Sequence, residues 1–339
     1  MLAALAACGE RAGPTLTDRI AGTPLEPAPF GEQVVVADLF PHDDELRGIS
    51  GLAASRDHAR LLWAISDTAT KLFAIRLLDE GVAVERVDVR GVTRFDWEDL
   101  AWFEDEGDAF LMIADVGTNR PDSRARRRDG AQVGMLHVVR EPRPGEEAVE
   151  VVRSLTFSLP CEPIRDLESV AVDSARREVV LVEKRARAHR ALVLDLDVDH
   201  HELRDADWTR ISLPDLEAWE QQPQRLESSQ LYQTRWRRNP TALDLLDRRA
   251  LLLTNRHAYL YARGDGASWR DALATAPQQL RIPFTLELPG RRPQTLPRGA
   301  APVLPQREAA CFDPTGSAVY VASEQRRDPQ AWLVRFDRR

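Results

Sequence analysis

Apolar and polar positions follow one layout that recurs five times along the chain. Each copy has a short strand-like stretch, a tight polar turn, and a second apolar stretch that ends in polar residues. The copies are GISGLAASRDHARLLWAISDTA from Gly48, DWEDLAWFEDEGDAFLMIADVG from Asp96, DLESVAVDSARREVVLVEKR from Asp166, NPTALDLLDRRALLLTNR from Asn239 and QREAACFDPTGSAVYVASEQR from Gln306. Turns rich in Asp and Gly are typical of β-hairpins. The pattern therefore predicts five antiparallel strand pairs.

Further strand-like segments follow each predicted pair. They are 71–80 and 82–90 after the first pair, 134–142 and 150–160 after the second, 190–198 and 207–214 after the third, 257–265 and 282–290 after the fourth, and 331–339 after the fifth. The fifth unit lacks one strand, which EQVVVADLF at 32–40 supplies. Four-stranded units arranged in a circle leave few exposed edges. We predict an all-β, five-bladed β-propeller in which an N-terminal strand completes the last blade.

Other all-β folds remain alternatives at this stage. A pair of β-sandwiches has similar strand spacing. A six-bladed propeller would need a sixth strand pair, and the chain shows none. The five-bladed interpretation accounts for residues 32–339 as a single propeller domain.

The composition narrows the classes of partner. With 46 basic and 54 acidic residues the net charge is −8, which argues against general binding of nucleic acid or of an anionic membrane. Lysine occurs only at Lys71 and Lys184, so arginine supplies most of the positive charge. Cys161 and Cys311 are interpreted as two buried thiols, with one disulfide as the alternative.

The N-terminal sequence MLAALAACGE predicts a lipid anchor. Its Leu-Ala-Ala-Cys stretch resembles the bacterial lipobox, whose cysteine is lipidated, here Cys8. Residues 1–8 would be a lipoprotein-type signal segment and residues 9–31 a tether, and Gly9 favours the outer membrane. The apolar stretch is short and no basic residues precede it, so a chance match is the alternative.

One position of the repeat carries an oxygen-bearing side chain in all five copies. Aligning the first strands places in one column, hereafter the column residues, Ser50, Glu98, Glu168, Thr241 and Glu308. In a propeller the first strands surround the central channel, so these side chains would converge. Carboxylates that lie close together repel unless a cation neutralises them, and hard oxygen ligands suit Ca²⁺ best. The column predicts a calcium site, and carboxylates that cap backbone amides are the alternative.

The second strand of each copy ends 15 to 17 positions after the column, and so returns to the same face. At these ends Lys184, Arg185 and Arg256 are predicted to bind phosphate oxygens. Asp67 and Asp115 are predicted to orient or deprotonate a water molecule. Ion pairs for the basic residues and turn formation for the aspartates are the alternatives.

The column resembles that of the calcium-dependent nucleotidases, the apyrases, which are five-bladed propellers. GISGLAAS followed by LLWAISDTATKLFAI is similar to the first blade of that family, VEKR resembles its basic phosphate-facing strand end, and TNR occupies another basic position. The resemblance implies one central Ca²⁺ held by the column, with nucleoside di- and triphosphates bound over it. WEDLA followed by DVGTN also resembles bacterial envelope propellers, whose last motif usually has a second Asp where this chain has Thr118.

These inferences predict a monomeric calcium-binding propeller of the cell envelope. Its activity would be metal-dependent hydrolysis of a phosphoanhydride or phosphoester, with a small phosphorylated ligand as partner. One alternative is a non-catalytic propeller in which Ca²⁺ is structural and a protein or glycan partner binds. A lactonase-type propeller enzyme is another, although such enzymes have six blades. Residues 214–238, with Trp219, Tyr232 and Trp236, are expected to form either a ligand-stacking lid or a packing loop.

Overall fold

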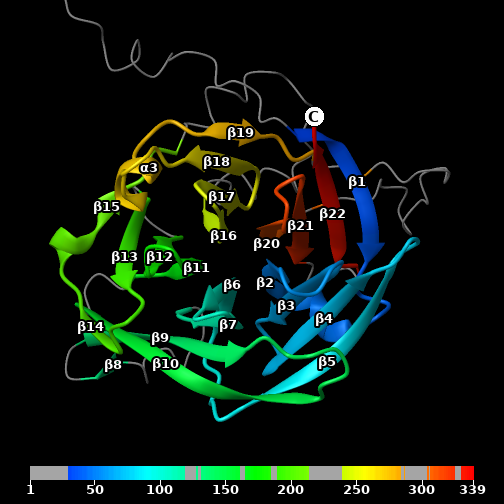
Figure 1. Ribbon diagram of the computed structural model, residues 1–339, viewed down its shortest axis with the longest axis horizontal. Coiled ribbons are helices and arrows are strands. Elements are labelled where there is room, and N and C mark those ends of the chain that lie inside the picture. Colours follow the sequence, from blue (N-terminus) through cyan, green and yellow to red (C-terminus); the bar gives the residue numbers. More distant parts are fainter. Residues whose placement is uncertain are drawn as a thin grey trace, which may run out of the picture.

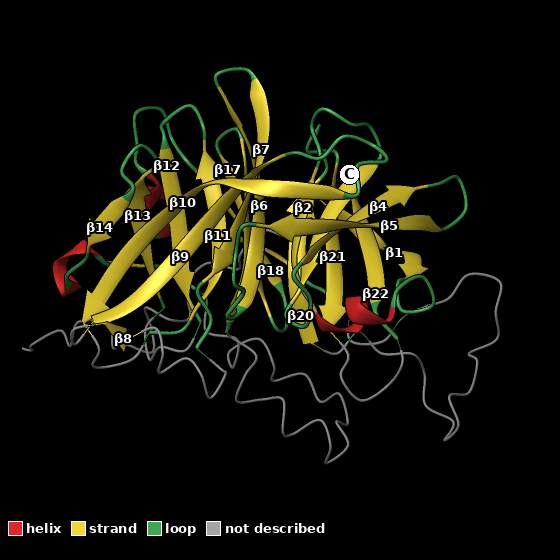
Figure 2. Cartoon of the chain, turned by 90° about the horizontal axis from the view of Figure 1, so that it is seen from below, coloured by secondary structure: helices red, strands yellow, loops and turns green. Residues whose placement is uncertain are grey.

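The chain forms a ring of β-sheets around a central axis (Figure 1). The computed structural model describes residues 30–118, 127–128, 131–160, 165–184, 189–213, 239–283, 286, 304, 306–324 and 330–339. Seen from the side, the strands of successive sheets run between the same two faces of the molecule (Figure 2). No helix in these ranges has both the length and the apolar character needed to cross a membrane.

The first two blades are joined at their outer edges. One contains β2 (Ile49–Ala54), β3 (Leu61–Ser66), β4 (Lys71–Leu77) and β5 (Val82–Arg90), and the other contains β6 (Trp97–Asp105), β7 (Asp108–Asp115), β9 (Ala131–Arg140) and β10 (Ala148–Pro160). Neighbouring strands within each blade are antiparallel. A short parallel pairing of β5 with β10 makes the two blades one continuous sheet. The two-residue strand β8 (Arg127–Arg128) pairs with β9.

The third and fourth blades are separate four-stranded sheets. The third contains β11 (Leu167–Asp173), β12 (Glu178–Glu183), β13 (Arg190–Asp195) and β15 (Thr209–Arg210), and the fourth contains β16 (Pro240–Leu246), β17 (Arg249–Thr254), β18 (Ala258–Ala262) and β19 (Gln278–Leu280). The connection after β13 also contains β14 (His200–Glu202), which pairs with β10, and the 3₁₀ turn η3 (Asp205–Asp207). The predicted strand 207–214 is therefore reduced to the two residues of β15.

The outer strand of the fourth blade corrects a prediction. It was expected at 282–290, but β19 ends at Leu280, and only part of the expected segment is described. Helix α3 (Trp269–Leu273) lies between β18 and β19, and the Ser268 hydroxyl caps it by accepting a hydrogen bond from the Asp271 N–H. Trp269 is fully buried. The capped helix and the buried Trp269 return the chain to the sheet within a few residues, so the outer strand begins nearer in sequence to β18 than the alternating pattern indicated.

The fifth blade confirms the predicted closure of the ring. It contains β20 (Gln306–Phe312), β21 (Ala318–Glu324), β22 (Trp332–Arg338) and β1 (Phe30–Asp38) in the order β20-β21-β22-β1. The N-terminal strand β1 pairs antiparallel with β22 near the other end of the chain. It begins two residues before the predicted boundary at residue 32. The five four-stranded units form an all-β propeller, as the repeat predicted.

Each first hairpin turns at a residue with a left-handed backbone. Positive φ angles occur at Arg60, Glu106, Gly107, Arg177, Asp247 and Gly316, so each of the five predicted turns contains at least one. Such angles match the tight turns that connect twisted antiparallel strands. They are the five turns that the Asp- and Gly-rich segments indicated.

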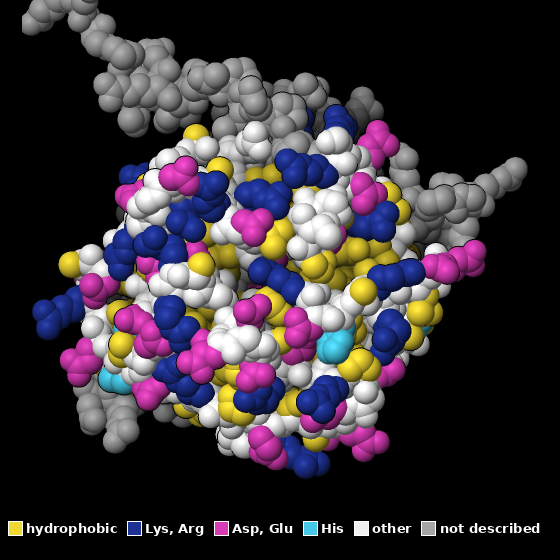
Figure 3. All heavy atoms as spheres, in the orientation of Figure 1, with side chains coloured by type: hydrophobic (Ala, Val, Ile, Leu, Met, Phe, Trp, Pro, Cys, Tyr) yellow, Lys and Arg dark blue, Asp and Glu magenta, His cyan; other side chains and the backbone are white. Residues whose placement is uncertain are grey.

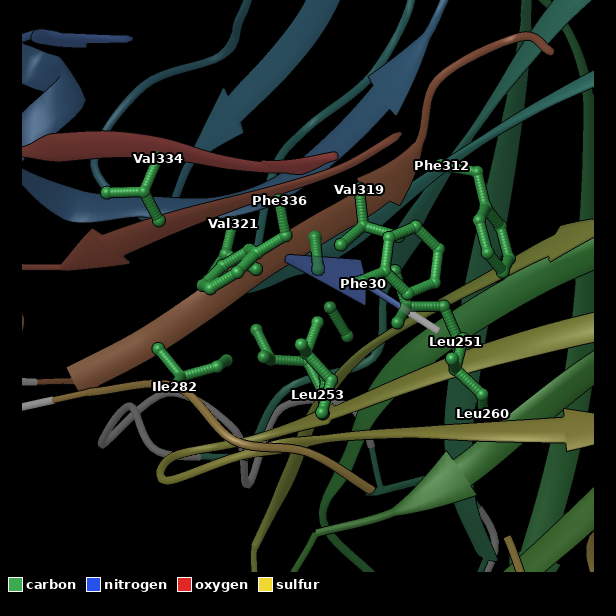
Figure 4. Close-up of a cluster of buried hydrophobic side chains, with 14 of the residues drawn as sticks. Phe30, Leu251, Leu253, Leu260, Ile282, Phe312, Val319, Val321, Val334 and Phe336 are labelled. Carbon is green, nitrogen blue, oxygen red and sulfur yellow. The ribbon is translucent and has the colours of Figure 1, made fainter. Parts of the chain in front are cut away.

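The hydrophobic core is divided into five clusters, one between each pair of neighbouring blades. Successive residues of a strand point to opposite faces of its sheet. Thus in β17 Leu251 and Leu253 pack against the fifth blade, whereas Ala250 and Leu252 pack against the third. The cluster between the fourth and fifth blades also contains Phe30 of β1 (Figure 4). Burial on both faces explains why the second strands are continuous apolar runs.

The first strands of the five blades form a closed inner ring. β2 contacts β6, β6 contacts β11, β11 contacts β16, β16 contacts β20, and β20 contacts β2. After η1 (Asp44–Gly48), β2 begins beside the start of β6, where Ser50 bonds to Trp97, and β16 begins beside the start of β20, where Thr241 bonds to Arg307. This arrangement brings equivalent residues of the five repeats together around the axis.

Candidate functional site

The column residues occupy the same structural position in all five blades. Each is the unpaired residue of a β-bulge, because two residues of the first strand lie opposite one residue of the second at this point. The bulges fall at Ser50, Glu98, Glu168, Thr241 and Glu308. A bulge redirects the side chain of its extra residue, and bulges are common next to active sites. The sequence alignment therefore placed five equivalent residues in register, although it contained no sign of the bulges.

The two hydroxyl groups of the column connect neighbouring blades. Ser50 Oγ donates a hydrogen bond of 3.0 Å to the carbonyl oxygen of Trp97 in the second blade. Thr241 Oγ1 donates in the same way to Arg307 in the fifth blade, at 2.8 Å. In both cases the acceptor is the residue that precedes a column glutamate. Because each hydroxyl donates its hydrogen bond to a carbonyl, the lone pairs of its oxygen remain available to another donor or to a cation.

The three column glutamates converge on the ammonium group of Lys184. Lys184 follows the last residue of β12, and its Nζ lies 2.5 Å from Glu168 Oε2 and 3.6 Å from Glu308 Oε2. Glu98 shares a hydrogen bond with Glu168 and also interacts electrostatically with Lys184. All four residues are buried. The sequence analysis placed Lys184 over the column as a phosphate ligand, and the structure places its ammonium directly on the carboxylates.

Two aspartates enlarge this group of charges. Asp96 and Asp166 each precede a column glutamate by two positions, and each interacts electrostatically with that glutamate. We call the axial cluster the set Asp96, Glu98, Asp166, Glu168, Glu308 and Lys184. Measured over the whole residue, every member is at most 7% exposed. Both aspartates directly precede the first residue of their strand.

Residues 115–118, the described part of the motif DVGTN, provide space and a hydrogen bond for the axial cluster. Gly117 lies so close that a Cβ there would collide with Glu98 Oε1 and would lie 2.5 Å from Asp96 Oδ2. Its N–H donates to the Asp96 carbonyl at 3.1 Å. Thr118 Oγ1 donates to Asp166 Oδ1 at 2.9 Å, which links the second blade to the third. Thr118, the residue that departs from the envelope-propeller pattern, thus supports a carboxylate of the neighbouring blade.

Burial and mutual repulsion control protonation in the axial cluster. Burial raises the pKa of Glu98 well above its ordinary value, and the carboxyl groups of Glu168 and Asp96 raise it further. Burial also raises the pKa of Glu168 to about 8, although Lys184 acts in the opposite direction. For Lys184, burial opposes the charged form, but the nearby glutamates outweigh it and raise the pKa. The nearby carboxylates therefore keep Lys184 charged, whereas burial favours the neutral form of Glu98.

Two amide side chains orient Glu308. Asn255 Nδ2 donates to Glu308 Oε1 at 3.0 Å, and Gln306 Nε2 donates to the same oxygen at 2.5 Å. Gln306 also donates to Glu324 Oε2 at 2.8 Å. The sequence analysis missed the role of Gln306. The available signal was its position two residues before a column glutamate, which matches that of Asp96 and Asp166.

Asp115, predicted as a general base, is fully buried and already holds the chain segment before Glu98. Its carboxylate accepts hydrogen bonds from the backbone N–H groups of Phe95, at 3.1 Å, and Asp96, at 2.7 Å. His137 Nε2 lies 3.5 Å from Asp115 Oδ2, and His137 Nδ1 is 2.8 Å from Ser154 Oγ. These contacts give Asp115 a structural role, and its role as a base stays a prediction.

Other predicted residues lie near the axial cluster or outside the described ranges. Asp67 is half-buried, and its Oδ1 lies 2.5 Å from where a Cβ of Gly48 would be, so it fills the space two positions before Ser50. Arg256 is half-buried just after β17. Arg185, the lid segment 214–238, Cys161 and Cys8 lie outside the described residues. The catalytic role of Asp67 and the ligand-binding role of Arg256 remain predictions.

Asp99 is an axial residue that the sequence analysis missed. It follows Glu98 directly and is fully buried. Its Oδ2 accepts hydrogen bonds from the backbone N–H of Val170, at 2.8 Å, and of Leu243, at 3.0 Å, while Oδ1 accepts from Leu100 at 2.9 Å. One carboxylate therefore joins the first strands of the second, third and fourth blades. The available signal was a second acidic residue inside an otherwise apolar strand.

The axial cluster supplies carboxylate oxygens, and Ser50 and Thr241 of the column supply hydroxyl oxygens, which match the preference of Ca²⁺. Within the described ranges, no group of three or more His, Cys, Asp and Glu side chains is spaced to enclose a metal ion. The glutamates are arranged around an ammonium, which is itself a cation. On the face drawn in Figure 3, basic and acidic side chains are interspersed, and neither sign gathers into one patch.

Comparison with known proteins gives structural similarities of low score. No protein-family model and no curated protein matches the chain. Among solved structures, it is similar to a nidogen/laminin complex (9% identity, TM-score 0.39, 81% of this chain and 72% of that chain). It is also similar to a luciferin-regenerating enzyme (9%, 0.43, 90% and 95%) and to the PQQ-bound aldose sugar dehydrogenase from Streptomyces coelicolor (10%, 0.40, 92% and 99%). Because these similarities are low, the description of the fold rests on the strand pairing.

Proposed function

We propose that this propeller binds a divalent cation, Ca²⁺, among the carboxylates at its axis. The observation that carries the proposal is the charge of the axial cluster, where five carboxyl groups and one ammonium are buried together and the ammonium lies next to two of the carboxylates. One ammonium cannot neutralise five carboxylates, so an excess of negative charge remains when these groups are ionised. Buried unpaired charge is costly, so a cation that neutralises it would stabilise the folded state.

The column residues are the proposed ligands. Glu98, Glu168 and Glu308 would supply carboxylate oxygens, and Ser50 and Thr241 would supply hydroxyl oxygens. Ca²⁺ suits this set better than Mg²⁺ because it accepts a variable number of oxygen ligands, whereas Mg²⁺ requires near-ideal octahedral geometry. Asp96, Asp166, Asn255 and Gln306 would orient the ligands, as such partners do in characterised metal sites.

The first test is the effect of calcium on stability. At a free Ca²⁺ concentration about a hundred times the dissociation constant, binding is expected to stabilise the protein by about 3 kcal/mol relative to excess chelator. Thermal unfolding with CaCl₂ and with chelator measures this difference. Glu98→Gln and Glu308→Gln should reduce the calcium effect, because each removes a charged ligand.

The matched control for this test is Glu80→Gln, which removes one carboxylate from an exposed turn. It should leave the calcium effect unchanged. Identical unfolding of the wild-type protein in calcium and in chelator would overturn the proposed cation site.

The finer proposal is that the protein hydrolyses a phosphoanhydride or phosphoester. It is supported by two basic residues, Lys184 and Arg256, which lie one and two residues after the second strands of neighbouring blades, at the end of the ring that carries the column. A bound Ca²⁺ would polarise a phosphoryl oxygen. Lys184 and Arg256 would bind the remaining anionic oxygens, and Asp67 would orient the attacking water.

One observation favours the non-catalytic alternative, in which the cation is structural and the same face binds a protein or glycan. Asp115, one of the two predicted bases, is occupied by two backbone N–H groups and lies beside His137. Only Asp67 is then left among the predicted bases in the described part of the chain.

Phosphate release distinguishes the two proposals. With a panel of nucleoside di- and triphosphates, the hydrolase proposal expects calcium-dependent release that Glu98→Gln lowers by about a hundredfold or more, because metal removal abolishes transition-state stabilisation. Arg256→Ala should raise KM, whereas Arg248→Ala, at an exposed arginine, should not. Calcium binding without release from any nucleotide would support the non-catalytic alternative. Lipid anchoring through Cys8, an envelope location and a monomeric state remain part of the proposal.

A further inference from the structure

Lys184 lies where a cation at the axis would lie. We propose that Lys184 is a built-in counter-ion of the axial site, which must leave before a metal ion can enter and which therefore sets the metal affinity. This inference rests on the proposed cation site and adds a competing group within the chain itself.

The Lys184 ammonium and the proposed metal ion would use the same carboxylate oxygens. The Lys184 ammonium contacts Glu168 Oε2 at 2.5 Å and faces Glu308 Oε2 at 3.6 Å, and both residues are proposed calcium ligands. The three side chains are only 9%, 2% and 7% exposed, so little water screens their charges. Two cations on the same buried carboxylates would repel strongly. Ammonium and metal ion are therefore alternatives at this position.

The Lys184 side chain can leave the site without unfolding a strand. Its backbone N–H donates to the Asp166 carbonyl at 2.8 Å, but Glu183 is the last residue of β12 that pairs with β11. Lysine carries its charge on a flexible four-carbon stem. Rotation of that stem alone would withdraw the ammonium while the carboxylates stay in place.

The site therefore holds a cation both without metal, when it is the Lys184 ammonium, and with metal. Without metal, the ammonium balances part of the carboxylate charge, which keeps the inner ring folded. With metal, the ion takes over that role. A site that must first release a competing group binds its metal more weakly than its donor atoms alone would allow.

The chain provides a matched control, because it has only one other lysine. Lys71 lies on β4, pairs with Glu45 at 3.4 Å, and is 28% exposed. Lys184→Met and Lys71→Met each replace a lysine with an uncharged, unbranched side chain of similar length, so each removes one positive charge. Only the first removes a cation from the axial cluster, so any difference between them reports on the site and not on net charge.

The experiment is a titration of each full-length variant with CaCl₂ alone at fixed ionic strength, followed by calorimetry or by competition with a fluorescent chelator. Lys184→Met is expected to lower the dissociation constant for Ca²⁺ by at least about tenfold, since a like charge has left the site. Lys71→Met should change it by less than about twofold, because screening weakens distant charges. Lys184→Arg, which keeps the charge, should bind no more tightly than the wild-type protein.

Each outcome decides the question. Tighter binding by Lys184→Met supports the inference, and so does a Lys184→Met protein that folds only when CaCl₂ is present, because calcium then replaces the ammonium. If the wild-type protein binds Ca²⁺ and Lys184→Met binds it equally or more weakly, or stays unfolded in CaCl₂, the inference is wrong while the cation site stands. If neither protein binds Ca²⁺, the proposed function itself is wrong, and the inference with it.

Discussion

Replacing Asp99 by alanine is expected to lower the free energy of unfolding by about 4 kcal/mol, because it leaves three backbone N–H groups without an acceptor in the core, each worth about 1–3 kcal/mol. Two of them, on Val170 and Leu243, belong to other blades. Asp99→Asn keeps one carbonyl oxygen and should have an intermediate effect. Urea unfolding of the two variants measures the series.

The control for Asp99 is Asp57→Ala, since Asp57 is exposed in the first hairpin turn. Its effect should stay within about 0.5 kcal/mol, as is usual for surface positions. A loss of less than about 1 kcal/mol in Asp99→Ala would show that the carboxylate does not hold the three blades together.

Replacing Gly117 by alanine is expected to weaken calcium binding by about a hundredfold, the upper range for changes in groups that position metal ligands. The added Cβ would collide with Glu98 Oε1 and lie 2.5 Å from Asp96 Oδ2. The Gly117 N–H is bonded to the Asp96 carbonyl, so the backbone cannot easily move away. The carboxylates would have to turn aside. Calcium titration of the variant, with melting temperature recorded in chelator, separates lost affinity from lost stability.

Gly264→Ala is the control, because a Cβ at Gly264 would meet no atom within 4 Å and its φ is not positive. It should match the wild-type protein in both measurements. Unchanged calcium affinity in Gly117→Ala would contradict the proposed position of Glu98 as a ligand.

The fold was largely predictable because its signals are local and repeated. The five hairpins have turn chemistry that acts over a few residues, and their strands are apolar on both faces because each sheet is packed between two others. The pairing of β1 with β22 was also predicted, from the missing strand of the fifth unit. The outer strand of the fourth blade was placed wrongly, because helix α3 and the buried Trp269 depend on packing that a strand pattern does not contain.

The candidate site was predicted in part. Equal hairpin lengths placed the five column residues in register, and the structure gives all five the same bulge. The structural roles of Asp99 and Asp115 were not visible, because their partners lie in other strands and far along the chain.

The sequence by itself determined the repeat, the all-β propeller, and which residues are equivalent from blade to blade, since these depend on spacing and on the burial pattern of each strand. Only the tertiary structure decided that the Lys184 ammonium lies on Glu168 and Glu308, that Gly117 makes room for Glu98, and that Asp99 joins three blades. The physical reason is that spacing along the chain defines equivalent positions. Contacts across the axis depend on how the ring closes and how each bulge directs its side chain.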